Sequence, residues 1–103
     1  MSETPTLGTT IDELTSIIEN RRDADLSQSY TARLLNGDMD ALLKKIGEEA
    51  TEVVMAAKDA SKDADTAHLR YEAVDLLYHL LVTCARFNLS PGELAIEIRG
   101  RFK

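Results

Sequence analysis

Apolar side chains recur at helical spacing in several separate segments of the chain, and each such segment predicts a helix. The first segment begins after Thr10, which together with Glu13 fits a capping box, so we expect a helix from there to about Arg21. A polar, turn-rich stretch follows. A short helix is then expected over 31–35, ended by Asn36-Gly37.

Two longer segments carry the strongest apolar patterns. The segment 38–60 has one apolar stripe, centred near Ile46, Ala50 and Ala57, and predicts a helix that buries this stripe. The stripe consists of Met39, Leu42, Leu43, Ile46, Ala50, Val53, Val54 and Ala57. The segment 66–88 also predicts a helix, and its middle is apolar almost all round, which favours a central position or a subunit contact. The small and charged stretch 58–65 is typical of a frayed helix end or a linker.

The last start signal is Ser90-Pro91, with Ser90 as the cap and Pro91 at the first helical position, and it predicts a helix to about Arg99. No segment alternates apolar and polar residues at period two, so the predicted fold class is all-α, a helical bundle. We expect residues 1–8 to form a flexible N-terminal tail and residues 9–103 to form a single domain.

Composition narrows the range of partners and locations. The chain has 18 acidic residues against 12 basic ones and a formal charge of −6, which argues against a nucleic-acid backbone or an anionic membrane as partner. No run approaches the roughly 18 apolar residues of a membrane span. The N-terminus lacks the basic start and apolar stretch of a signal peptide, so a cytoplasmic location is expected.

Two of the predicted helices place carboxylates beside their apolar faces. At about 100° per residue, Glu49 and Glu52 lie on one flank of their helix with Lys45, and Glu72 and Asp75 border the face of theirs. If the two helices pack side by side, the four carboxylates converge. Their mutual repulsion is then costly unless protons or cations neutralise it, and oxygen ligands without sulfur suit Mg²⁺ or Mn²⁺.

The same residues also allow a plainer interpretation as solvated helix faces. Glu-rich faces are common, and Lys44 with Glu48 and Lys45 with Glu49 form ordinary i,i+4 pairs. A lone His79 is likewise compatible with a hydrogen-bonded, semi-buried histidine instead of a ligand. Spacing alone leaves both interpretations open.

The acidic pairs occur in an order that resembles a known superfamily. Glu48-Glu49-x-x-Glu52, followed by Glu72-x-x-Asp75, resembles the Glu-Glu-x-x-Glu and Glu-x-x-Asp signature of the all-α nucleoside triphosphate pyrophosphatases. The flanking segments narrow this resemblance to the phosphoribosyl-ATP pyrophosphatases of histidine biosynthesis, over about residues 9–100. These segments are Ser29-Tyr30-Thr31, Gly37, Lys45-Ile-Gly-Glu-Glu49 and Asp75-Leu-Leu-Tyr-His79.

The resemblance implies hydrolysis of the α–β phosphoanhydride of phosphoribosyl-ATP, which gives phosphoribosyl-AMP and pyrophosphate. Glu48 would orient or deprotonate the attacking water, and Lys45 would neutralise phosphate oxygens. The magnesium ligands of the family match Glu49, Glu52, Glu72 and Asp75. Further candidates for contacting the substrate are Arg21, Arg22, Ser29, Tyr30, Thr31, Lys44 and His79.

Two other functions stay open at this point. A house-cleaning pyrophosphatase of the same superfamily, acting on a canonical or damaged (d)NTP, would use the same metal site. A non-enzymatic helical dimerisation module would carry the acids as a solvated rim. A helix that is apolar on nearly every side needs more cover than one small subunit offers, so we expect a homodimer with segment 66–88 in its contact.

Overall fold

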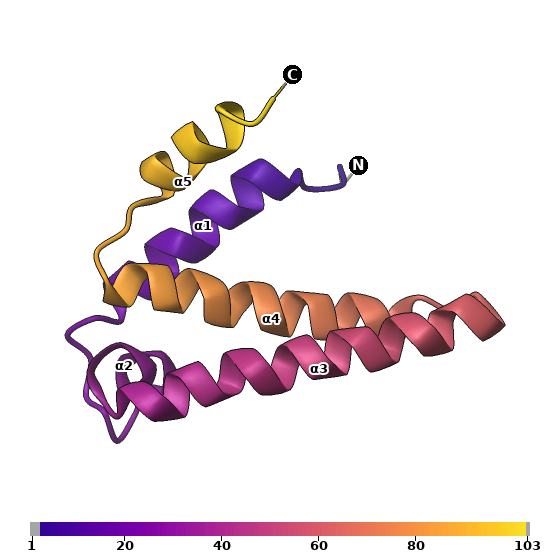
Figure 1. Ribbon diagram of the computed structural model, residues 1–103. Helices are drawn as coiled ribbons and strands as arrows, with labels where there is room; N and C mark the ends of the chain where they lie inside the picture. Colours follow the sequence, from indigo (N-terminus) through magenta and orange to yellow (C-terminus); the bar gives the residue numbers. More distant parts are fainter. Residues whose placement is uncertain (1–2, 103) are drawn as a thin grey trace.

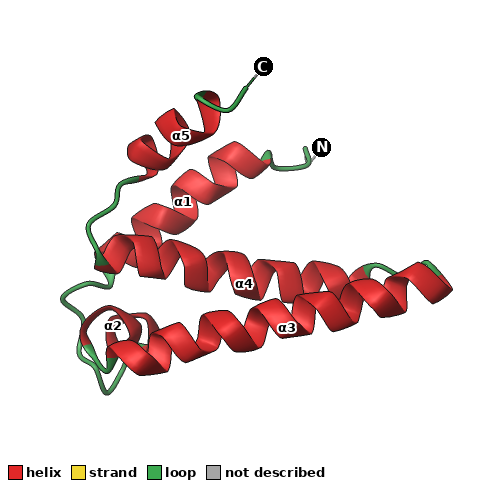
Figure 2. Ribbon diagram, viewed as in Figure 1, coloured by secondary structure: helices red, strands yellow, loops and turns green. Residues whose placement is uncertain are grey.

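The computed structural model describes residues 3–102, which form five helices and no strand. The predicted all-α class is therefore confirmed (Figure 2). None of the described helices combines the length and the apolar character needed to cross a membrane. In chain order the helices are α1 (Leu7–Asn20), α2 (Tyr30–Asn36), α3 (Met39–Asp63), α4 (Ala67–Arg86) and α5 (Pro91–Arg99).

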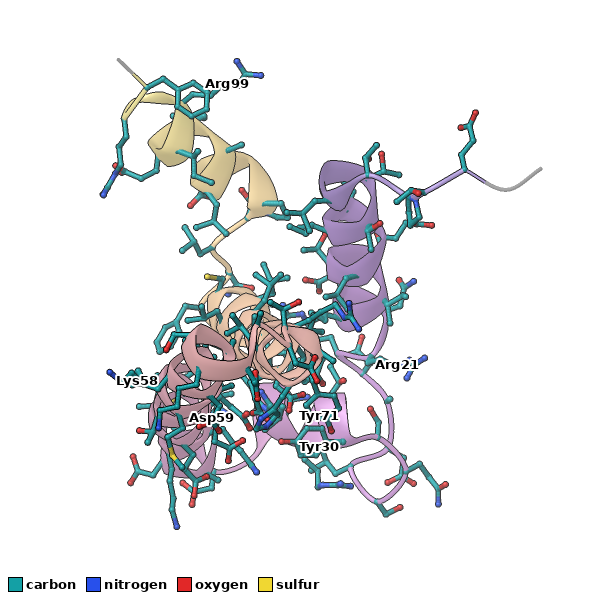
Figure 3. All side chains as sticks on the ribbon, turned by 90° about the vertical axis from the view of Figure 1, so that its right-hand side faces the viewer. Arg21, Tyr30, Lys58, Asp59, Tyr71 and Arg99 are labelled. Carbon is teal, nitrogen blue, oxygen red and sulfur yellow. The ribbon has the colours of Figure 1, made fainter. Side chains whose placement is uncertain are left out.

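Helices α3 and α4 lie side by side and antiparallel, and together they form a long hairpin (Figure 1). Helix α2 contacts both of them at the end where α3 begins and α4 finishes. Helix α1 contacts α4, while α5 leaves the end of α4 and is splayed away from α1 (Figure 3). Helix α4 thus has the central position that its apolar surface predicts.

The hydrophobic core lies at one end of this hairpin, where α1, α2, α3 and α4 meet. Among the described residues, no member of the buried apolar cluster lies between positions 43 and 80. The other half of the hairpin is therefore held mainly by the contact between its own two helices. The core cluster consists of Ile18, Leu34, Leu35, Leu42, Leu81 and Val82.

The start of α1 differs from the prediction. The helix begins at Leu7 and not after Thr10, because the Thr6 hydroxyl accepts a hydrogen bond from the backbone N–H of Thr9 at 3.2 Å and caps the helix one turn earlier. Two residues of the expected tail, Leu7 and Gly8, are consequently helical. The first two residues of that tail lie outside the described part of the chain.

The end of α3 also differs, since the helix continues to Asp63 through most of the expected linker. Alanine and lysine favour the helix even without burial, and the helix stops only where Ala64 adopts a left-handed backbone with φ 62°. The predicted start of α5 is confirmed, because the Ser90 hydroxyl accepts a hydrogen bond from the Glu93 N–H at 3.1 Å.

The largest difference concerns the side of α3 that is buried. Leu42, Glu49 and Ala56 are buried, whereas Val54 and Ala57 of the predicted apolar stripe are exposed. Helix α4 therefore packs on the acidic flank of the stripe and not on its centre. As a result, a carboxylate lies inside the helix contact while part of the stripe faces solvent.

One arginine fixes the corner between α2 and α3. Arg86 of α4 donates from Nη1 to the carbonyl of Leu34 and from Nη2 to the carbonyl of Gly37, both at 2.8 Å. These carbonyls stand at the end of α2, where helical hydrogen bonding leaves acceptors without a partner. Glycine is required at position 37, because a Cβ would lie 2.6 Å from the carbonyl oxygen of Arg33.

Replacing Arg86 by Met keeps an aliphatic stem and removes both hydrogen bonds. We expect R86M to lower the free energy of unfolding by about 2–4 kcal/mol, because two part-buried carbonyls lose a charged donor. Urea denaturation at one fixed protein concentration measures the change. The control R101M removes only the exposed ion pair with Glu97 and should cost less than about 1 kcal/mol. Equal losses in the two variants would contradict this role of Arg86.

Candidate active site

The two acidic pairs meet where α3 and α4 pack together. Carboxylate oxygens of Glu49, Glu72 and Asp75 all lie within 4.8 Å of one another. Glu49 comes from α3, and the other two residues stand three positions apart on α4, so they share one face of that helix. The convergence predicted for these three carboxylates is present in the structure.

Burial distinguishes this cluster from a solvated helix face. The exposed fraction of Glu49 is 7% and that of Glu72 is 5%. The Oε2 atom of each is buried and has no hydrogen-bond partner among residues 3–102. A buried polar atom without a partner costs about 1–3 kcal/mol, and a charged one costs more. Each of these two glutamates therefore retains a buried oxygen that a cation could satisfy.

The fourth carboxylate of the prediction, Glu52, lies exposed at the edge of the cluster. The adjacent Glu52 carboxyl group raises the pKa of Glu72, and burial and the nearby charge of Asp75 act in the same direction. His68, whose Nε2 lies 3.3 Å from Glu72 Oε1, opposes this shift. The sequence interpretation missed His68, although its position four residues before Glu72 was an available signal.

Helix α2 contacts α4 immediately beside the cluster. The Tyr30 hydroxyl lies 3.0 Å from His79 Nε2, and His79 Nδ1 lies 2.9 Å from the backbone carbonyl oxygen of Asp75. Because a carbonyl only accepts, we assign the proton to Nδ1, and Nε2 then accepts from Tyr30. The exposed fraction of His79 is 5%. It is thus a buried, hydrogen-bonded histidine, as the alternative to a ligand role expected.

The neighbours of Tyr30 make contacts within the protein. The buried Ser29 hydroxyl accepts from the Ala32 N–H at 3.0 Å and caps α2. The hydroxyls of Thr31 and Tyr78 are hydrogen-bonded to each other. Tyr78 was not singled out as a site residue by the sequence. The predicted contacts of Ser29 and Thr31 with a substrate stay predictions.

The two lysines and the remaining acid singled out on α3 differ in their surroundings. Lys45 is half-buried and stands one helical turn before Glu49. Burial raises the pKa of Tyr30, and the positive charge of Lys45 opposes that shift. Glu48 and Lys44 are exposed and lie outside the three-carboxylate group. Of these three residues, Lys45 has the surroundings expected of an active-site residue.

The two arginines predicted to contact the substrate lie away from the carboxylates. Arg22, in the turn after α1, donates from Nη2 to the backbone carbonyl of Ala85 at 2.8 Å and thereby joins this turn to α4. Ala85 stands ten positions after Asp75, which is about 15 Å along a helix. The Arg21 side chain points outward from the end of α1 (Figure 3). The structure therefore does not bring these arginines to the cluster.

Comparison with known proteins agrees with this geometry. A family model described as phosphoribosyl-ATP pyrophosphohydrolase matches residues 11–101. The phosphoribosyl-ATP pyrophosphatase of Paracidovorax citrulli (strain AAC00-1) is 46% identical to this chain, over 91% of the chain and 71% of the relative. The proteins of the same name from Janthinobacterium sp. (strain Marseille) and Variovorax paradoxus (strain S110) are 47% and 45% identical. They cover 89% and 98% of this chain, and the chain covers 84% and 82% of their lengths.

The match extends over nearly all of the described helices, and it includes both acidic pairs. The resemblance inferred from the Glu-Glu-x-x-Glu and Glu-x-x-Asp segments is thus confirmed. A purely non-enzymatic dimerisation module is the wrong interpretation of these segments. The chain is a hydrolase that belongs to the phosphoribosyl-ATP pyrophosphohydrolase family.

Proposed function

We propose that the protein hydrolyses the α–β phosphoanhydride of phosphoribosyl-ATP, in a reaction that depends on Mg²⁺ and yields phosphoribosyl-AMP and pyrophosphate. This reaction is the second step of histidine biosynthesis. The predicted location of the protein is the cytoplasm. The observation that carries the proposal is the buried group of three carboxylates with two unpartnered oxygens, in a chain of this family.

The donor set fits a hard divalent cation. All three clustered ligand atoms are carboxylate oxygens, which Mg²⁺ and Mn²⁺ prefer to sulfur ligands. We assign Glu49, Glu72 and Asp75 as ligands and Glu52 as a fourth ligand from the edge of the cluster. When bound, the cation supplies neutralisation of phosphate charge and acidification of water.

Two further side chains complete the proposed chemistry. Lys45 is half-buried and stands one helical turn before Glu49 on α3, and it would neutralise phosphate oxygens in the bound substrate. Glu48 is exposed and is not a member of the three-carboxylate group, so its carboxylate remains available to orient or deprotonate the attacking water. Both roles follow the positions of these residues beside Glu49 on α3.

A house-cleaning (d)NTP pyrophosphatase is the second candidate, because the same carboxylates would serve that reaction. Family membership favours phosphoribosyl-ATP. Pyrophosphate release should be measured with phosphoribosyl-ATP beside a panel of NTPs and dNTPs at equal concentration. A higher kcat/KM for any panel member than for phosphoribosyl-ATP would reverse the assignment.

Removing one ligand charge tests the metal assignment. We expect E49Q and D75N to lose activity by at least about 100-fold at saturating Mg²⁺, since each ligand is needed to stabilise developing charge. Stability in urea should be unchanged or slightly higher, because repulsion among the carboxylates falls. The control E97Q changes an exposed glutamate on α5 and should keep full activity. Unfolding of either ligand variant, or near-normal turnover, would contradict the assignment.

The cation should also stabilise the fold in the absence of substrate. A ligand that binds only the folded protein raises its stability by mass action, by about 2.7 kcal/mol at a hundred times its Kd. We therefore expect millimolar Mg²⁺ or Mn²⁺ to raise the Tm of the wild type, and E49Q to lose most of that increase. Zn²⁺ should give no larger shift. A wild-type Tm that ignores Mg²⁺, with and without a substrate analogue, would argue against the site.

We further propose that the active form is a homodimer. The single chain exposes 7641 Å², whereas a compact monomer of this mass exposes about 5,800 Å². Its radius of gyration of 15.5 Å likewise exceeds the roughly 13 Å of a compact domain of this length. The excess surface of one chain exceeds the roughly 800 Å² that each partner buries in a standard dimer interface. The monomer is therefore more open than its length requires.

The apolar side of the α3–α4 hairpin is the surface we propose for this contact. Leu43 and Val54 stand eleven residues apart on α3, about three turns, and they are 45% and 62% exposed. Val54 lies about 200° around the helix from Glu52 and so points away from the carboxylates. On α4, Leu80 is 43% exposed. Leu81 of the same helix is buried in the core of the single chain, so it is not part of the proposed dimer surface.

A charge on this surface tests the dimer. We expect wild type to sediment at about twice 11.4 kDa at micromolar concentration, and V54E to shift toward the monomer, because burying an unpaired carboxylate is costly. The control M55E alters the neighbouring exposed apolar residue, which lies about 100° around α3 from Val54 and on the side of Glu52. An active wild-type species of monomer mass, or equal effects of the two variants, would contradict this interface.

A further inference from the structure

A chain of two hydrogen bonds links α2 to the backbone of a proposed metal ligand. The Tyr30 hydroxyl donates to His79 Nε2 at 3.0 Å, and His79 Nδ1–H donates to the Asp75 carbonyl at 2.9 Å. His79 is buried, so water does not compete freely for its ring nitrogens. Both nitrogens are therefore occupied by contacts within the protein.

The aromatic rings around this link hold it in one orientation. The ring of Tyr78 stands at 81° to the His79 ring, with centroids 5.0 Å apart, and it stacks at 6.4 Å on Tyr30. The Arg33 guanidinium covers the Tyr30 ring at 5.7 Å from its centroid. Edge-to-face and stacked pairs of this kind restrict ring rotation. The hydroxyl of Tyr30 is thus directed at His79.

The charges of the clustered carboxylates influence the Tyr30 hydroxyl. Burial raises the pKa of Tyr30 most, Lys45 opposes this shift, and the charges of Glu49 and Asp75 add to it. The hydroxyl consequently keeps its proton near neutral pH and remains a donor to His79. Tyr30 is the first residue of α2, the helix that contacts both helices of the metal cluster.

The carboxylate cluster needs such a restraint. Three like charges within 4.8 Å repel one another, and among residues 3–102 the small side chain of Ala56 is the only buried apolar one between positions 43 and 80. Metal sites bind tightly when their ligands are held in place before the cation arrives. Helix α2 is the element that contacts both helices beside the cluster.

We propose that Tyr30 and His79 form a positioning pair for the metal centre. Through the backbone of Asp75 they hold its carboxylate at the spacing needed to bind a cation with Glu49, and they do not contact the substrate. This inference rests on the magnesium site proposed above. It assigns the two residues a different role from the substrate contact predicted by the sequence resemblance.

Mn²⁺ binding measured by electron paramagnetic resonance in the absence of substrate tests the pair. We expect Y30F to bind Mn²⁺ about tenfold more weakly than wild type, the lower end of the effect of losing a residue that supports a metal ligand. The matched control Y78F also removes a hydroxyl contact between α2 and α4, but not the one leading to Asp75, and should bind Mn²⁺ within about twofold of wild type. The KM of Y30F for phosphoribosyl-ATP at saturating Mn²⁺ should equal that of wild type.

The possible results separate the alternatives. Unchanged Mn²⁺ affinity in Y30F would overturn the inference, and with a raised KM it would restore a substrate contact. Equal weakening in Y30F and Y78F would also overturn it, because general docking of α2 would then explain both. A wild-type protein that binds no Mn²⁺ would overturn the metal site itself, and this inference with it.

Discussion

The packing of α3 against α4 along the acidic flank of α3 is the contact on which the rest of the structure depends. Leu42 and Ala56 are buried in it, and Glu49 stands seven residues from each, so it shares their side of the helix. The burial of these two apolar side chains therefore carries a carboxylate into the contact, opposite Glu72 and Asp75. Natural proteins tolerate such conflicts with stability mainly at functional sites.

Burial of a polar group without a hydrogen-bond partner is specific to the carboxylate cluster in the described part of the chain. Four polar or charged residues are buried in the described part of the chain: Ser29, Glu49, Glu72 and His79. Ser29 and His79 have hydrogen-bond partners, as buried polar groups usually do. The two glutamates each retain one oxygen without a partner among residues 3–102. In the described part of the chain, buried side-chain atoms without a hydrogen-bond partner thus occur only where the family resemblance implies a cation.

The same contact determines the outer surface of the hairpin. Because α4 covers the acidic flank of α3, the apolar stripe on that helix is left partly uncovered, with Val54 exposed. The metal cluster and the proposed dimer surface are therefore consequences of one choice of helix face. A chain that buried the stripe instead would have a more complete monomer core and would separate its carboxylates.

The sequence by itself determined the helical class, the five helical segments and the acidic residues of the site, because helical periodicity, caps and the order of the acidic pairs are local properties. It failed at the start of α1 and the end of α3, where an equally good cap at Thr6 and helix-favouring alanines shifted the boundaries. Only the tertiary structure decided which flank of α3 meets α4, since both flanks have apolar residues and the choice depends on long-range packing. That choice placed Glu49 in the contact, linked Tyr30 to His79 and kept Arg22 away from the carboxylates, and none of these follows from spacing along one helix.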